Sequence, residues 1–147
     1  SQDDLENITK KLRNSKKKIV TLNGAFDILH KGHEKILREA KKQGNVLFVG
    51  LNSDNFIRKS KGERRPVNNI KTRLLSLSAN PNVDYVFEFS EDTPVNFLEK
   101  IKPDVHVNGS EYGKQCIEKD VVLENGGSIW IVKLLADYST TRLINGE

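Results

Sequence analysis

An apolar run, a loop rich in glycine and histidine, and a helix-like pattern follow one another near the start of this chain. Ile19–Leu22 is short, apolar and β-branched, which is typical of a buried strand. After the loop Asn23–His33, apolar residues recur at helical spacing from Ile36 to Ala40. Gly44 then stands where this helix is expected to end. The pattern predicts a strand-to-helix unit of an α/β protein, whose loops at the carboxyl ends of strands bind ligands.

Two histidines give the loop its chemistry. His30 and His33 are three residues apart beside the expected helix N-terminus, and Gly24 allows backbone to approach a ligand closely. Unpaired N–H groups at a helix N-terminus favour a phosphate, and imidazoles there can donate hydrogen bonds to phosphoryl oxygens. The alternatives are a solvated pair or half of a zinc site. Zinc needs three or four nitrogen or sulfur ligands, and the chain offers only His106 and Cys116 besides.

The sequence F-D-x-x-H-x-G-H at residues 26–33 resembles the signature of the nucleotidylyltransferase superfamily, which includes cytidylyltransferases and pantetheine-phosphate adenylyltransferase. The hydroxyl triplet at residues 139–141, followed by Ile144, matches the superfamily's C-terminal motif, although such a triplet is also a common helix cap. The resemblance covers residues 18–145. It implies transfer of a nucleoside monophosphate from a nucleoside triphosphate to a phosphorylated acceptor, with pyrophosphate leaving together with Mg²⁺.

The resemblance also implies roles for individual residues. His30, His33 and Lys61 are expected to be catalytic, the two histidines at the α- and β-phosphates. The residues expected to bind the nucleotide are Asn23, Gly24, Ala25, Phe26, Asp27, His33, Asn108, Gly109, Glu111, Tyr112, Ser139, Thr140 and Thr141. The residues expected to bind the acceptor are Asp54, Arg64, Arg65 and Arg73. No side chain is expected to hold a resident metal ion.

The segment Arg58–Val67 is dense in cations, and its glycine and proline break regular structure. Its composition suits a mobile loop that closes over a polyanionic triphosphate, and it equally suits a solvated loop. The sequence K-G-x-x-R-P-V at residues 61–67 closely resembles the heptose-phosphate adenylyltransferase branch of the superfamily. That resemblance favours phosphate contacts from Lys61, Arg64 and Arg65.

Asp54 follows a second expected strand, Val46–Leu51. Its carboxylate could hold a substrate hydroxyl, hold a magnesium-bound water, or cap the next segment. In the family an acidic residue commonly follows this strand, which favours a functional role. Asn68 is expected to cap a helix that carries Arg73, and in the family an arginine on this helix approaches the active site.

Three later segments, Val83–Phe87, Pro103–Val107 and Ser128–Val132, also have the pattern of strands. Glu91–Pro94 is a good helix-capping sequence, and it also resembles a stretch of the heptose branch that shapes the sugar-phosphate side. His106 lies inside the fourth strand, where a packed histidine is the favoured interpretation over a catalytic one.

The segment Val107–Tyr112 corresponds to the family sequence V-K-G-G-D-Y, which lies near the base and ribose. Here asparagine replaces the usual lysine at position 108, and serine and glutamate replace glycine and aspartate at positions 110 and 111. An amide cannot supply the positive charge of lysine. The choice of base and acceptor is therefore open at this point.

Strand and helix patterns alternate throughout residues 18–147, and no internal repeat is found. The chain is therefore predicted to be an α/β, Rossmann-like protein: a single domain with a parallel five-stranded sheet and helices on both faces. Residues 1–17 are predicted to be an N-terminal helical extension, because Leu5, Ile8 and Leu12 recur at helical spacing. Residues 18–147 are predicted to form the nucleotidylyltransferase domain.

The composition of the chain narrows the classes of binding partner that are expected. The net charge of +4 is concentrated in two clusters that lack interleaved aromatic residues, so a nucleic acid is not expected. The single cysteine excludes an internal disulfide and fits a reducing, cytoplasmic location. No apolar run approaches a transmembrane length and no signal peptide is visible, so no membrane partner is expected. Homodimers are common in the family, which implies a homodimer here.

The resemblance favours ATP and D-glycero-D-manno-heptose 1-phosphate as substrates, giving an ADP-heptose for surface polysaccharide such as lipopolysaccharide. A glycerol-3-phosphate cytidylyltransferase that uses CTP is the nearest alternative. The arginine that usually precedes the last motif in cytidylyltransferases is absent, because Leu135–Tyr138 stands there. A non-catalytic nucleotide-binding module is a second alternative, which predicts nucleotide binding without release of pyrophosphate.

Overall fold

The structure is a computed structural model that describes residues 2–27, 29, 31–62, 64, 66–89, 95–109 and 118–132. In chain order its elements are α1 (Gln2–Asn14), β1 (Ile19–Gly24), α2 (Lys31–Lys41), β2 (Val46–Asn52), α3 (Asp54–Lys61), α4 (Ile70–Ser78), β3 (Tyr85–Phe89), α5 (Val95–Ile101), β4 (Val105–Gly109), α6 (Glu118–Glu124) and β5 (Ser128–Val132).

The five strands form one parallel sheet in the order β3-β2-β1-β4-β5. The chain moves outward from β1 to β3, returns across the sheet, and then adds β4 and β5 on the other side of β1. The order therefore reverses between β1 and β4, and ligands of open α/β sheets bind beyond the carboxyl ends of the strands at such a point. The predicted parallel five-stranded sheet is confirmed.

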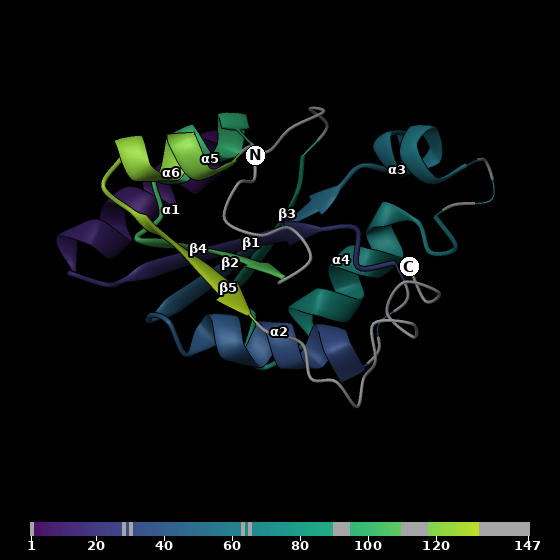
Figure 1. The fold of residues 1–147 in the computed structure, drawn as a ribbon, viewed down its shortest axis with the longest axis horizontal. Coiled ribbons are helices and arrows are strands. Elements are labelled where there is room, and N and C mark those ends of the chain that lie inside the picture. Colours follow the sequence, from purple (N-terminus) through teal and green to yellow (C-terminus); the bar gives the residue numbers. More distant parts are fainter. Residues whose placement is uncertain are drawn as a thin grey trace.

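Alternating side chains of the strands divide the core into two layers. Val20 and Leu22 of β1 belong to the cluster that includes Leu37 of α2 and Leu77 of α4. Ile19 belongs to the opposite cluster, which contains residues of α1, α5 and α6. Figure 1 shows the same division, with α2 and α4 below the sheet and α1, α5 and α6 above it. Helices cover both faces, so the predicted Rossmann-like architecture of a single domain is confirmed.

The N-terminal helix predicted from Leu5, Ile8 and Leu12 is α1, and these three residues contact the second cluster. Arg13, near the end of α1, donates hydrogen bonds to the carbonyl oxygens of Ile101 and Lys102 at the end of α5. The guanidinium thereby satisfies carbonyl groups that a helix C-terminus leaves without intrahelical partners. The boundary between residues 17 and 18 stays a prediction.

At the amino-terminal edge of the sheet, two aspartate side chains accept hydrogen bonds from the backbone of β1 and β2. The carboxylate of Asp104 accepts a hydrogen bond from the backbone N–H of Ile19, 2.8 Å away. The carboxylate of Asp84 accepts from the N–H of Leu47 at 2.8 Å and pairs with the ammonium of Lys41. These contacts lie at the edge opposite the predicted binding loops.

None of the helices in the described part of the chain is long and apolar enough to cross a membrane.

The structure corrects the predicted bounds of β3 and β4 and the predicted role of Gly44. Tyr85 begins β3, two residues later than predicted, and β4 runs from Val105 to Gly109 instead of from Pro103 to Val107. Gly44 lies in the turn after α2 but is not among the glycines with positive φ. A Cβ at Gly44 would lie 2.6 Å from a methyl group of Val20, so close packing against β1, not a left-handed helix cap, accounts for this glycine.

Candidate active site

The loop between β1 and α2 carries the histidine signature at the carboxyl edge of the sheet. Phe26 is buried and has a φ of 49°, a left-handed conformation that is uncommon for an aromatic residue. Its ring lies against the α-carbon of Gly24, where a Cβ would come within 3.0 Å of the ring. The Phe26 ring also contacts the imidazole of His33, with ring centroids 5.2 Å apart. Phe26 therefore closes the core and supports His33 on the first turn of α2.

His30 lies outside the described residues. The expected meeting of His30 and His33 at one phosphate therefore stays a prediction. His33 is partly exposed on α2, at the edge where the predicted nucleotide site lies.

Asp27 connects this loop to the segment that precedes α4. One carboxylate oxygen accepts a hydrogen bond from the backbone N–H of Val67 and the other from the N–H of Asn68, both at 2.7 Å. In return, the side-chain amide of Asn68 donates to the carbonyl oxygen of Asp27 at 2.6 Å. The end of the cationic segment is thereby held beside the histidine signature.

The cap of α4 differs from the prediction. Asn69, and not Asn68, is the N-cap, and its side chain accepts a hydrogen bond from the N–H of Thr72 at 2.9 Å. The amide of Asn68 is already bound to Asp27, which explains why the next asparagine takes the cap.

Arg73 of α4 is buried, with only 1% of its surface exposed. Its Nε donates to the carbonyl oxygen of Asn68 at 3.0 Å, and Nη1 donates to the carbonyl oxygens of Ala25 and Asn52 at 3.1 and 2.7 Å. Its Nη2 pairs with a carboxylate oxygen of Asp54, 2.5 Å away. The other oxygen of Asp54 accepts from the N–H of Ile70 at 3.2 Å.

Both carboxylate oxygens of Asp54 thus accept hydrogen bonds from its own chain, one from Arg73 and one from Ile70. The cap of α3 is Ser53, whose hydroxyl accepts from the N–H of Phe56 at 3.2 Å. Ser53, and not Asp54, therefore caps the segment that follows β2, so the capping alternative for Asp54 is wrong. The predicted contacts of Asp54 and Arg73 with the acceptor stay predictions.

The cationic segment is only partly a loop. Arg58–Lys61 forms the last turn of α3, where Arg58 donates to the side chain of Asn55 at 2.8 Å. Gly62, with a φ of 105°, ends the helix. Arg64 is exposed, whereas the side chain of Lys61 and all of Arg65 lie outside the described part. Arginine and lysine are good helix formers, so the helix extends into the cationic sequence up to the glycine.

Only some of the residues that are predicted to bind the nucleotide after β1 lie in the described part of the chain. Asn108 and Gly109 are the last residues of β4, and their backbone pairs with Ile131 and Val132 of β5. Glu111, Tyr112 and the triplet Ser139, Thr140 and Thr141 lie outside the described residues. Asn23, near the end of β1, has a buried side-chain oxygen with no hydrogen-bond partner in the described part of the chain.

His106 is a packed histidine, as predicted. Its side chain is fully buried in β4, and its Nδ1 lies 2.7 Å from the hydroxyl oxygen of Thr21 on the neighbouring strand β1. Burial lowers the pKa of His106 from 6.5 to about 3, because the charged imidazolium is poorly solvated there. The imidazole is therefore neutral at physiological pH.

We expect this histidine to make the protein less stable as the pH falls below about 6.5, since the unfolded chain then binds a proton that the folded chain rejects. The loss reaches up to ~1.4 kcal/mol in the free energy of unfolding for each pH unit between the two pKa values. Urea denaturation at pH 5.0 to 7.5 measures it. His106→Gln should have a flatter profile than the wild type, and His33→Gln serves as the matched control. Equal slopes for the wild type and His106→Gln would contradict the assignment.

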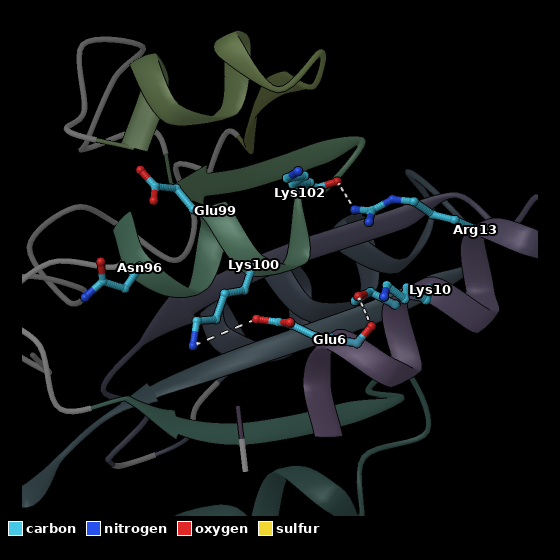
Figure 2. Close-up of a pocket in the computed structure, with 8 residues that line it drawn as sticks. Glu6, Lys10, Arg13, Asn96, Glu99, Lys100 and Lys102 are labelled. Carbon is cyan, nitrogen blue, oxygen red and sulfur yellow. Dashed lines mark hydrogen bonds and ion pairs between the residues drawn. The ribbon is translucent and has the colours of Figure 1, made fainter. Parts of the chain in front are cut away.

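A cavity of about 530 Å³ lies between α1 and α5, away from the signature loop. Figure 2 shows its charged lining, including Glu6, Lys10, Arg13, Lys100 and Lys102. None of these residues is a predicted site residue. The two helices belong to the layer opposite α2 and α4, which carry His33 and Arg73. The cavity is therefore not the candidate active site.

Comparisons with known proteins show the family to which this chain belongs. A family model described as Cytidylyltransferase-like matches residues 21–145. The bifunctional protein HldE of Aliarcobacter butzleri is 44% identical over 143 residues, covering 97% of this chain and 29% of that protein. HldE of Campylobacter concisus is 45% identical over 145 residues, covering 98% and 29%. The chain thus spans less than a third of the length of these relatives.

A solved structure is also similar. The crystal structure of the lipopolysaccharide core biosynthesis protein from Thermoplasma volcanium superimposes with a TM-score of 0.65 at 28% sequence identity. The match covers 81% of this chain and 97% of that chain. The similarity therefore extends over nearly all of that protein.

Proposed function

Because this chain belongs to the cytidylyltransferase-like family, we propose that it is a nucleotidyltransferase that transfers AMP from ATP to D-glycero-D-manno-heptose 1-phosphate. The product would be an ADP-heptose for surface polysaccharide. Similarity to the HldE proteins over 97% and 98% of the chain supports the choice of branch. The K-G-x-x-R-P-V sequence at residues 61–67, which resembles the heptose-phosphate adenylyltransferase branch, points to the same choice.

One structural observation carries the proposal. The carboxylate of Asp27 binds the backbone of Val67 and Asn68, so the cationic segment ends beside the loop of the histidine signature. A polyanion at the carboxyl edge would then meet imidazole, guanidinium and the N-terminus of α2 together. These are the groups that stabilise a transferring phosphoryl centre.

In the proposed reaction, a phosphate oxygen of the heptose 1-phosphate attacks the α-phosphorus of ATP. A phosphorus–oxygen bond forms there, and the bond from the α-phosphorus to the bridging oxygen breaks. The pyrophosphate leaves with that electron pair. No residue becomes covalently attached, so the protein contributes alignment and charge neutralisation. We assign the α- and β-phosphates to His30 and His33, and the distal phosphates to residues 139–141. We assign the triphosphate or the sugar phosphate to Lys61, Arg64 and Arg65.

We propose that Mg²⁺ arrives with the triphosphate. Magnesium usually keeps several waters and binds through few carboxylates plus substrate phosphates. Within the described residues, no three His, Cys, Asp or Glu side chains are grouped to hold a metal. The carboxylates of Asp27 and Asp54 already accept hydrogen bonds from the protein. This donor set fits an ion held mainly by phosphate and water, which would neutralise charge on the leaving pyrophosphate.

The test is release of pyrophosphate from ATP, CTP, GTP and UTP, each with heptose 1-phosphates, other sugar phosphates or glycerol 3-phosphate. The expected result is release from ATP only when a heptose 1-phosphate is present. Release from CTP with glycerol 3-phosphate would replace the proposed substrates with those of the alternative enzyme. Nucleotide binding without release from any pair would instead favour the non-catalytic module.

The oligomeric state, proposed to be a homodimer, is measured on the same sample by light scattering.

A further inference from the structure

Three segments at the carboxyl edge of the sheet are fastened to one another by three charged side chains. The first segment is the loop after β1, the second is the junction of β2 with α3, and the third is the stretch from Val67 to Ile70. The side chains are Asp27, Asp54 and Arg73. Two of the three segments border known features of the candidate site: the histidine signature and the cationic segment.

The carboxylate of Asp27 accepts hydrogen bonds from two backbone groups of one short stretch. Each carboxylate oxygen accepts an N–H, from Val67 and Asn68, at 2.7 Å. These two residues directly follow the K-G-x-x-R-P segment. The carboxylate is therefore oriented toward the protein chain and fixes where the cationic segment ends. Hydrogen bonds to a charged carboxylate are among the stronger ones.

Arg73 uses most of its donors on the protein. A guanidinium has five N–H groups, and this one makes four hydrogen bonds, to three carbonyl oxygens and one carboxylate oxygen. The side chain of Arg73 has no exposed surface. A phosphate would have to displace these contacts to bind here. The side chain of Arg73 therefore joins the ends of β1 and β2 to the start of α4.

The cationic segment is consequently held at both ends. At its start, α3 is fixed by the Ser53 cap, and the Ser53 N–H donates to the carbonyl oxygen of Phe89 at 3.1 Å. At its end, Val67 and Asn68 are fixed by Asp27. Arg64 and its neighbours lie between these two anchors. A displacement of about 1 Å of a positioned group is enough to lower a rate about a hundredfold.

We infer that Asp27 and the Asp54–Arg73 pair are positioning residues, which hold the cationic segment beside the histidine signature and do not themselves contact the substrates. The inference rests on the proposed function, since it names what the positioned cations serve. It differs from the sequence prediction, which placed Asp27 at the nucleotide and Asp54 and Arg73 at the acceptor.

The first experiment uses the rate of trypsin cleavage, and not enzyme activity, to test whether Asp27 holds the end of the cationic segment. Asp27→Asn keeps the shape of the side chain but turns an amide N–H₂ toward one of the two backbone N–H groups. Trypsin cleavage after Arg64 should become about tenfold faster, because the end of the segment opens more often. The matched control is Asp84→Asn, which removes a carboxylate that also accepts a backbone N–H, at the opposite edge. This control should leave cleavage after Arg64 unchanged.

Unchanged cleavage in Asp27→Asn, at a melting temperature equal to that of Asp84→Asn, would overturn the inference. This result would leave the proposed function untouched, because the wild type would still release pyrophosphate. A wild type without any transferase activity would overturn the proposed function, while protection of Arg64 by Asp27 would still be measurable. The two failures are therefore distinguishable.

The second experiment separates positioning from direct contact by a double-mutant cycle. Asp27→Asn should lower kcat by about tenfold or more in the wild-type background. In a background where Lys61, Arg64 and Arg65 are alanine, the same change should lower kcat by less than about twofold, because the groups that Asp27 positions are gone. Equal factors in both backgrounds would mean that Asp27 acts on the substrate independently of the segment, and would overturn the inference.

Discussion

His33→Ala should lower kcat by about two to three orders of magnitude, the effect of removing one donor that stabilises charge in a transition state. His33 stands on the first turn of α2, and its imidazole is supported by the ring of Phe26. Because α2 begins at Lys31 and its N-terminus faces the carboxyl edge, the imidazole and the helix dipole act on the same phosphate in the proposed reaction. Initial rates of pyrophosphate release at saturating ATP and acceptor measure the effect.

Arg38→Ala is the matched control for this experiment. It removes an exposed cation from the same helix, two turns away from the loop, and should leave kcat unchanged. His30→Ala should resemble His33→Ala, with a loss of about two orders of magnitude or more. Normal turnover in His33→Ala, with Arg38→Ala also normal, would show that the imidazole has no part in the chemistry.

Arg73→Ala should lower the free energy of unfolding by about 3–5 kcal/mol, the usual loss when one partner of a buried ion pair is removed. Three carbonyl oxygens and the carboxylate of Asp54 lose their donor at once. Since single domains are stable by only about 5–15 kcal/mol, this is a large share of the total. Urea denaturation followed by circular dichroism measures the difference.

Two other variants make this prediction sharper. Arg58→Ala removes an exposed arginine with one side-chain hydrogen bond, and it should lower stability by less than ~1 kcal/mol. Arg73→Lys keeps the charge but cannot reproduce the planar fork, so its stability should lie between those of the wild type and Arg73→Ala. Equal stability of Arg73→Ala and Arg58→Ala would contradict the buried role of Arg73.

The fold was predictable because its signals are local. Each strand is a short apolar run, and the periodic patterns between strands indicate a parallel sheet. Helices α3 and α6 were not predicted. The packed role of His106 was predictable in the same way, from its place within an apolar strand. Its partner Thr21 was not, because that contact depends on the register between β1 and β4.

The contacts of the candidate site were less predictable because they join residues far apart in the sequence. Asp27 binds residues 40 and 41 positions away, and Arg73 reaches Ala25 across 48 positions. The signature indicated that Asp27 matters, but not that its carboxylate binds backbone. The displaced cap at Asn69 has the same origin, since the contact of Asn68 with Asp27 is tertiary. Local capping preference cannot separate two adjacent asparagines.

Many of the contacts made by Asp27 and Arg73 at the carboxyl edge are with main-chain atoms. Asp27 binds two backbone N–H groups, and Arg73 binds three backbone carbonyl oxygens. Contacts with main-chain atoms do not depend on which side chains the anchored residues carry. Side chains between Gly62 and Pro66 could therefore be exchanged while the attachment points persist, and the proposed phosphate contacts of this stretch would change with them. A scaffold of this kind allows the preference for one phosphorylated acceptor over another to diverge without rebuilding the sheet.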